Sequence, residues 1–217
     1  MLIAEKIALL RLYPEKGRPY LDMSPDVQPT SFLVDLFLRG NISFKEKMVQ
    51  VINRDTNSPF LDEPIKFLLS DGVWGAGPHD MRRAIKLLNA FTGMFNQSEI
   101  YKHYINEGIL RDETIKNPKL YFNQEDFQQK LISDIKKTTL GVDMPDVADY
   151  FVLRMLKMGH LLKRYFSKPE IKEIKVLLKM DHNKIGIEGN MTDLIQSIIK
   201  ELRRRNKIHS GGLSHIG

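Results

Sequence analysis

The sequence contains no cysteine, a single tryptophan and no long apolar run. The absence of cysteine excludes disulfides and thiolate metal sites and favours a reducing compartment, so we expect a cytoplasmic protein. A membrane-spanning helix needs about 20 consecutive apolar residues, and no segment approaches that length. The first apolar stretch, Leu2–Leu10, contains Glu5 and Lys6 and lacks a cleavage pattern. It therefore predicts the first helix of the fold rather than a signal peptide.

Recognisable catalytic signatures are also lacking. The sequence has no Gly-x-Ser-x-Gly elbow and no His-Glu-x-x-His pair, and its Gly75-Ala76-Gly77 stretch is not followed by the Gly-Lys-Ser/Thr of a phosphate loop. From these absences we predict a protein that is not an enzyme and that has no cofactor and no metal site.

Positive charge is present but unevenly placed. The net charge is +6, and residues 201–217 alone carry four cationic residues against one acidic residue. A general nucleic-acid binder usually shows a basic face across its body. A basic cluster at the end of a helix is favoured by the helix macrodipole. Contact with an anionic surface is the alternative interpretation of the cluster Arg203–Arg205.

Two short signatures about seventy residues apart give the strongest structural signal. They are Leu36–Ile42 and Tyr104–Leu110, and each is typical of an amphipathic helix that ends at a glycine and continues directly into a strand. The chain is 42% hydrophobic and 28% charged, as expected of a globular protein. We predict a mainly α-helical single domain over residues 1–208 with two short antiparallel β-hairpins, followed by a flexible tail over 209–217.

The spacing of apolar residues predicts the positions of the remaining helices and hairpins. The hairpins are expected near Ile42–Ile52 and Ile109–Phe122, and a loop rich in proline over residues 14–29. Thr30 and Ser31 are favourable N-caps and predict that the second helix starts there. Further helices are expected over about 61–69, 81–95, 98–107, 124–138, 145–166, 169–180 and 191–205.

The second hairpin combines cationic and apolar residues. The cations are Lys102, Arg111, Lys116 and Lys119, interleaved with Ile115, Leu120, Tyr121 and Phe122. A basic hairpin with aromatic side chains is suited to phosphate groups of lipid or of nucleic acid. In the opposite interpretation Leu120 and Phe122 face the core and the lysines are solvated.

The order and spacing of several motifs resemble the Golgi phosphoprotein 3 family over nearly the whole chain. The matching stretches are Ile3–Leu10, Leu33–Gly40, Leu61–Glu63, Glu107–Leu110 and Gln129–Ile132. The resemblance implies a helical domain with one protruding hairpin that dips toward a membrane. It also implies a peripheral membrane protein of the type that binds phosphatidylinositol 4-phosphate.

The resemblance further implies a lipid-headgroup pocket, and this sequence changes its key positions. The family's lipid-contacting tryptophan falls on Tyr20, an arginine of the same loop falls on Pro29, and two basic contacts fall on Met94 and Gln97. Because phosphate recognition needs positive charge and donors, we expect phosphatidylinositol 4-phosphate binding to be weak or absent.

The sequence thus favours a cytoplasmic protein that lies peripherally at the cytoplasmic face of a membrane. Its expected partner is an anionic membrane surface or a phosphoinositide, contacted through the hairpin residues Lys116, Lys119, Leu120, Tyr121 and Phe122. Partner proteins are a further expectation, and nucleic acid is disfavoured. The alternative function is a winged-helix-like module for nucleic-acid binding or protein interaction. The sequence does not determine the oligomeric state.

Overall fold

The computed structural model describes residues 1–19, 25–70, 77–91, 97–113, 119–180, 187 and 189–211, except for the side chains of residues 91, 97, 98 and 205–211. Within this part of the chain the fold is mainly α-helical with short antiparallel β-hairpins, which confirms the predicted fold class. The helices are α1 (Ile3–Leu10), α2 (Val27–Leu38), α3 (Pro59–Leu69), α4 (Met81–Phe91), α5 (Gln97–Asn106), α6 (Phe127–Thr139), α7 (Val147–Met158), α8 (Leu162–Tyr165), α9 (Lys168–Leu177) and α10 (Asn190–Gly211). The strands are β1 (Leu12–Tyr13), β2 (Arg18–Pro19), β3 (Ile42–Lys45), β4 (Met48–Val51), β5 (His79–Asp80), β6 (Leu110–Asp112) and β7 (Leu120–Phe122).

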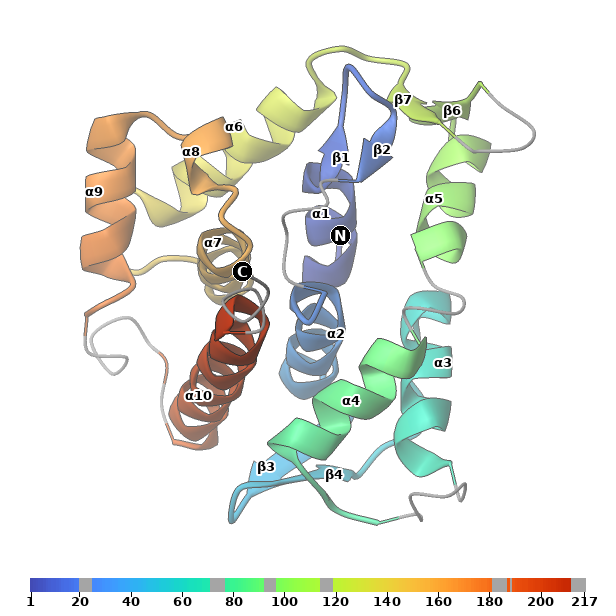
Figure 1. Ribbon diagram of the computed structural model, residues 1–217, viewed down its shortest axis with the longest axis vertical. Helices are drawn as coiled ribbons and strands as arrows, with labels where there is room; N and C mark the ends of the chain where they lie inside the picture. The colour runs from blue at the N-terminus through green and yellow to red at the C-terminus, as the bar shows by residue number, and fades with distance from the viewer. Residues whose placement is uncertain are drawn as a thin grey trace.

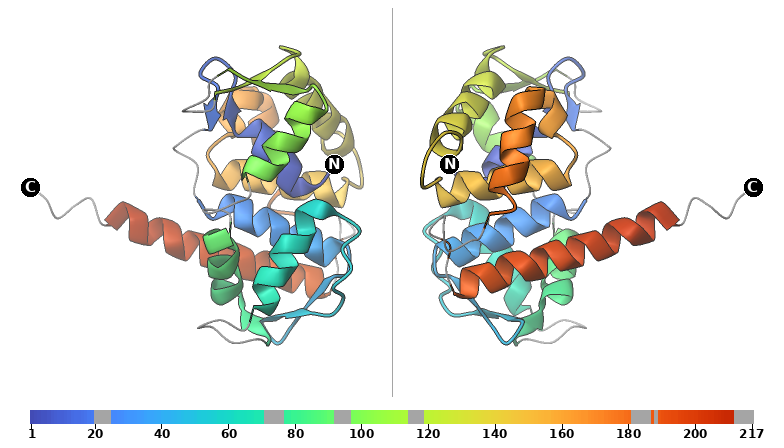
Figure 2. Two further views of the ribbon diagram at one scale, coloured as in Figure 1. Left: turned by 90° about the vertical axis from the view of Figure 1, so that its right-hand side faces the viewer. Right: turned by 90° about the vertical axis from the view of Figure 1, so that its left-hand side faces the viewer.

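Helices α1 and α2 lie at the centre of the molecule (Figure 1). Helices α7 to α10 lie on one side of them, and α3 and α5 lie on the other. The β1–β2 and β6–β7 hairpins share one end of the molecule, where α6 arches across, and the β3–β4 hairpin lies at the opposite end. Helix α10 runs out beyond the body of the fold (Figure 2).

Helix α1 is apolar nearly all round, as a central helix should be. All of its residues except Lys6 are buried. Its buried N-terminus needs hydrogen-bond acceptors, and Asp35 of α2 supplies them by accepting the backbone N–H groups of Ile3 (2.9 Å) and Ala4 (2.8 Å). Glu5 accepts from the N–H of Leu2 and from the hydroxyl of Tyr104, both at 2.7 Å. Two buried carboxylates therefore anchor the central helix.

Both predicted helix–glycine–strand units are present and close in the same way. The N–H of Gly40 donates to the Phe37 carbonyl (3.0 Å), and the N–H of Asn41 donates to Leu36 (2.9 Å). At the end of α5, Gly108 donates to Ile105 (3.0 Å) and Ile109 donates to Tyr104 (2.9 Å). The two glycines have φ angles of 71° and 69°. Each unit is a Schellman motif, and three residues separate the end of the helix from the start of the strand.

We expect Gly108→Ala to lower the free energy of unfolding by about 1–2 kcal/mol, since the left-handed conformation is costly for any residue with a Cβ atom. No heavy atom lies within 4 Å of a Cβ built at this position, so the cost is one of backbone conformation alone. Chemical denaturation measures it. Gly108→Asn is the control and should cost less, because asparagine tolerates this region better. An alanine variant as stable as the parent protein would contradict the assignment.

The first part of the chain departs from the predicted pattern in two places. Residues expected to form a loop contain the β1–β2 hairpin, which pairs Leu12 with Pro19 and Tyr13 with Arg18. Helix α2 begins at Val27, so Thr30 is not an N-cap; its hydroxyl donates to the carbonyl of Asp26 (2.6 Å). The earlier start is allowed because a proline in the first helical turn lacks only an N–H that has no partner there.

Three further boundaries differ from the prediction. The helix expected over 145–166 is interrupted after Met158, where His160 has a φ angle of 59° and α8 starts in a new direction. A third strand, β5, pairs with β4 by placing His79 opposite Val49. Helix α10 continues to Gly211, so residues 209–211 are helical rather than part of a tail, since nothing in Ile208-His209-Ser210 breaks a helix.

Candidate functional site

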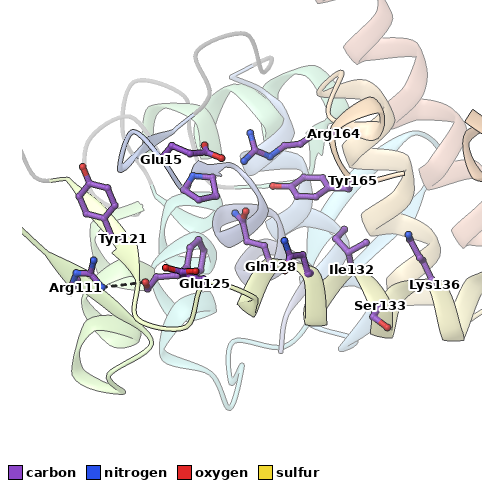
Figure 3. A pocket seen from close by; sticks show the side chains of 13 residues that line it. Glu15, Arg111, Tyr121, Glu125, Gln128, Ile132, Ser133, Lys136, Arg164 and Tyr165 are labelled. Atoms are coloured by element: carbon purple, nitrogen blue, oxygen red, sulfur yellow. Dashed lines mark hydrogen bonds between the residues drawn. The ribbon is translucent and has the colours of Figure 1, made fainter. Parts of the chain in front are cut away.

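A hollow in the described surface lies beside the two neighbouring hairpins. Its volume is about 900 Å³, and we call it the hairpin hollow. Its lining comes from the β1–β2 turn, both strands of the β6–β7 hairpin and helices α6 and α8: Pro14, Glu15, Arg111, Tyr121, Phe122, Glu125, Gln128, Gln129, Ile132, Ser133, Lys136, Arg164 and Tyr165. Figure 3 shows Arg111 and Lys136 at opposite ends, with Gln128 and Ile132 between them. The stretch of α6 from Gln128 to Lys136 is about 12 Å long at 1.5 Å per residue, so the hollow is elongated.

Contact between the two hairpins forms one end of the hollow. The carbonyl of Gly17, in the β1–β2 turn, accepts the N–H of Leu120 (2.7 Å). A Cβ atom at Gly17 would lie 2.9 Å from the Cβ of Lys119 and from the ring of Tyr121. Glycine is therefore required here for close approach as well as for its φ of 62°. This contact fixes the position of Tyr121 in the lining.

Three cationic side chains from three separate elements line the hollow. Arg111 of β6 donates to Glu113 (2.9 Å) and to the Phe122 carbonyl (3.4 Å). Lys136 of α6 pairs with Glu170 of α9 at 2.8 Å. The guanidinium of Arg164, from α8, lies 4.9 Å from the centre of the Tyr13 ring and 5.3 Å from that of Tyr165. Each cation thus already has a partner within the fold before any ligand binds.

Polar groups complete the lining between these cations. Gln128 is buried, and its side-chain amide donates to the carbonyls of Leu9 (2.7 Å) and Leu12 (3.0 Å), which ties α6 to the end of α1. The hydroxyl of Tyr165 donates to the carbonyl of Leu10, and burial raises the pKa of Tyr165 to about 12. Glu15 and Glu125 add two carboxylates. The described lining therefore offers three positive charges, two negative charges and several neutral hydrogen-bonding groups.

The ion pair between Lys136 and Glu170 affects the ionisation of Glu170. The pKa of Glu170 is lowered to about 2, chiefly by its hydrogen bond with Lys136 and then by bonds from the backbone and hydroxyl of Ser167. Glu170 therefore stays ionised over the physiological range. An anionic ligand that binds Lys136 has to compete with this carboxylate or bind beside it.

The pocket implied by the family resemblance is only partly described. Tyr20 and Met94 lie outside the described residues, and Gln97 opens α5 with its side chain not described. Pro29 is buried in the first turn of α2, so it cannot contact a ligand at the surface. The side-chain amide of Asn89, near the end of α4, donates to Asp26 at the start of α2 (2.9 Å). This bond brings the end of α4 to the start of α2, near Pro29.

The prediction that the second hairpin faces a membrane is wrong for two of its residues, Leu120 and Phe122. Leu120 and Phe122 are 8% and 7% exposed, and Phe122 stacks on Phe127 with ring centres 5.4 Å apart. They share one face of β7 and belong to the core, so they offer no apolar anchor to a membrane. Lys119 is exposed, and Tyr121 points to the other face and lines the hollow. Lys116 lies outside the described residues.

No group of three or more histidine, aspartate or glutamate residues in the described part of the chain is arranged to hold a metal ion. Among the described helices, none combines the length and the apolar character needed to cross a bilayer. No protein-family model and no curated protein matches this sequence.

Proposed function

We propose that this protein is a non-enzymatic peripheral membrane protein that binds an anionic lipid headgroup in the hairpin hollow. The observation that carries the proposal is the placement of Arg111, Lys136 and Arg164, which come from three separate elements and line one open hollow beside the two hairpins. The family resemblance of the sequence supports the same class of function.

The chemistry of the lining suits a phosphorylated headgroup that also carries hydroxyl groups. Guanidinium and ammonium groups bind phosphate through charge-assisted hydrogen bonds. Glu15, Glu125 and the amides of α6 are suited to accept hydrogen bonds from hydroxyls. Because Arg111 and Lys136 already have carboxylate partners, part of the attraction is offset, and a modest affinity that falls with salt is expected.

The cations of the hollow are not at the positions that the resemblance implies for the headgroup pocket. None of Tyr20, Pro29, Met94 and Gln97 is cationic, and Pro29, the one of the four whose side chain is described, does not line the hollow. Weak or absent recognition of phosphatidylinositol 4-phosphate at those four positions therefore stays a prediction. The proposal places headgroup binding on Arg111, Lys136 and Arg164 instead.

The test is flotation with phosphatidylcholine vesicles that contain phosphatidylserine or phosphatidylinositol 4-phosphate. Each cation near an anionic surface contributes about 1 kcal/mol, so Arg111→Gln with Lys136→Gln should weaken partitioning roughly thirtyfold at low salt. The matched control is Lys66→Gln with Lys102→Gln, which also removes two ion-paired cations but lies on α3 and α5.

The control should bind as the parent protein does. Equal loss in both double variants would indicate a general charge effect and would contradict a site in the hollow. A duplex oligonucleotide tested in parallel addresses the winged-helix alternative. Binding to the duplex but not to vesicles would replace the lipid proposal with a nucleic-acid one.

A further inference from the structure

A second group of cations lies on the opposite side of the molecule from α5. Helices α7, α9 and α10 lie on that side (Figure 1), and α10 runs below α9 in the right-hand view of Figure 2. The group consists of Lys157 in the last turn of α7, Lys175 in the last turn of α9, Lys179 just beyond α9, and Arg203 on α10, and we call it the Lys157 cluster. None of its members lines the hairpin hollow.

A buried arginine sets the position of the cluster. Arg154 lies one helical turn before Lys157 and is 8% exposed. Its guanidinium donates to the hydroxyl of Tyr150 and to the carbonyl of Leu178 (3.0 Å). The second bond fastens the end of α9, which carries Lys175 and is followed by Lys179, to the turn of α7 that precedes Lys157. A buried hydrogen bond thus holds the α7 and α9 parts of the cluster in relation to each other.

Among the described residues, no acidic side chain is paired with the cluster. Within the described residues, none of its four members makes an ion pair or a side-chain hydrogen bond, whereas the neighbouring Arg204 is paired with Glu201 at 2.7 Å. The pKa of Lys157 is lowered, first by burial and then by the charges of Arg154, Arg203, Lys179 and Lys175. One cation at each helix end is favoured by the macrodipole. That effect does not account for several cations brought together around a half-buried amine.

We propose that the Lys157 cluster is a binding site for a polyanion that carries two or more phosphate groups. Lysine supplies compact point charges and Arg203 supplies a forked donor, which together suit closely spaced phosphates. The site goes beyond the proposed function, since it uses other elements on another face. Free polyphosphate and a multiply phosphorylated lipid headgroup share this chemistry, and the experiment distinguishes them.

The first arm of the test measures thermal unfolding with sodium tripolyphosphate against sodium chloride of equal ionic strength. A ligand that binds only the folded state should raise Tm by roughly 5–10 °C at a hundred times its Kd. Lys157→Gln should abolish most of this rise, and Lys175→Gln with Lys179→Gln should do the same. In the absence of ligand these variants should melt no lower than the parent protein, because neutralisation removes repulsion.

Two control variants test whether the rise in Tm arises from the Lys157 cluster. Lys45→Gln removes an exposed cation from β3 at another part of the surface and should leave the rise intact. The double variant Arg111→Gln with Lys136→Gln should also keep the rise in Tm. This result separates a failure of the headgroup proposal for the hairpin hollow from a failure of the proposal for the Lys157 cluster. A rise no larger than that in sodium chloride, or an undiminished rise in Lys157→Gln, overturns the site.

The second arm identifies the source of the phosphates. Vesicles that contain phosphatidylinositol 4,5-bisphosphate are floated with the parent protein and with Lys157→Gln, with and without tripolyphosphate. Loss of flotation in the variant and competition by tripolyphosphate assign the site to a lipid headgroup. If the rise in Tm depends on Lys157 but flotation does not, the site is assigned to a soluble polyphosphate. Binding of a duplex oligonucleotide without any response to tripolyphosphate would overturn both assignments.

Discussion

Replacing Asp35 with alanine is expected to lower the free energy of unfolding by about 2–6 kcal/mol. The substitution leaves the backbone N–H groups of Ile3 and Ala4 buried without an acceptor, and each such donor costs about 1–3 kcal/mol. Because α1 is the central helix, the loss should appear in global unfolding rather than in local fraying. Equilibrium denaturation monitored by circular dichroism measures it.

The same carboxyl predicts a pH dependence of stability. Burial raises the pKa of Asp35 from 3.8 to about 7, and the bonds from Ala4 and Ile3 offset only part of that effect. A folded-state pKa above the unfolded value means that the folded protein binds the extra proton. The contribution of Asp35 is therefore fully present below about pH 4 and is lost as the pH rises through 7.

Asp35→Asn is the matched variant, since it keeps the shape of the side chain but does not titrate. The parent protein should exceed this variant in stability by more at pH 5 than at pH 8. A difference that stays constant or grows with pH would contradict the burial of a titrating carboxyl at this position.

Gly17→Ala is expected to cost about 2–5 kcal/mol, from a left-handed residue and an overpacked contact. The new methyl group would meet the Cβ of Lys119 and the ring of Tyr121 at 2.9 Å, and the hairpins would have to separate. The bond between the Gly17 carbonyl and Leu120 would weaken. Since Tyr121 lines the hollow, binding of anionic vesicles should fall together with stability.

Gly141→Ala separates the two causes of this loss. Its φ of 67° matches that of Gly17, but a Cβ atom there would meet no heavy atom within 4 Å. This variant should lose only the backbone part, about 1–2 kcal/mol, and should bind vesicles as the parent protein does. If both alanine variants are equally stable, the hairpins are not in contact through Gly17.

The fold class could be predicted from sequence because its strongest signals are local. The Schellman motifs at Gly40 and Gly108 depend on a glycine placed just after an apolar helical stripe, and both hairpins follow from them. The β1–β2 hairpin was missed because strands of two residues show no periodicity. Strand β5 was missed because its pairing with β4 involves residues distant in sequence.

The candidate site was less accessible to sequence reasoning. Arg111 was noted beside the second hairpin, but Lys136 and Arg164 lie on helices 25 and 53 positions further along the chain. No local pattern links them, and only the packing of α6 and α8 on the hairpins brings them to one hollow. The burial of Leu120 and Phe122 was predictable, since residues two apart in a strand share a face and both are apolar.

Flotation of the unaltered protein is the most direct test of its proposed role at membranes. Phosphatidylcholine vesicles with phosphatidylserine are compared with pure phosphatidylcholine vesicles, first at low salt and then near physiological ionic strength. We predict that the protein floats with the anionic vesicles at low salt, less at higher salt, and not with the neutral vesicles. Equal flotation with both vesicle types, or none with either at low salt, would contradict a function based on anionic headgroups.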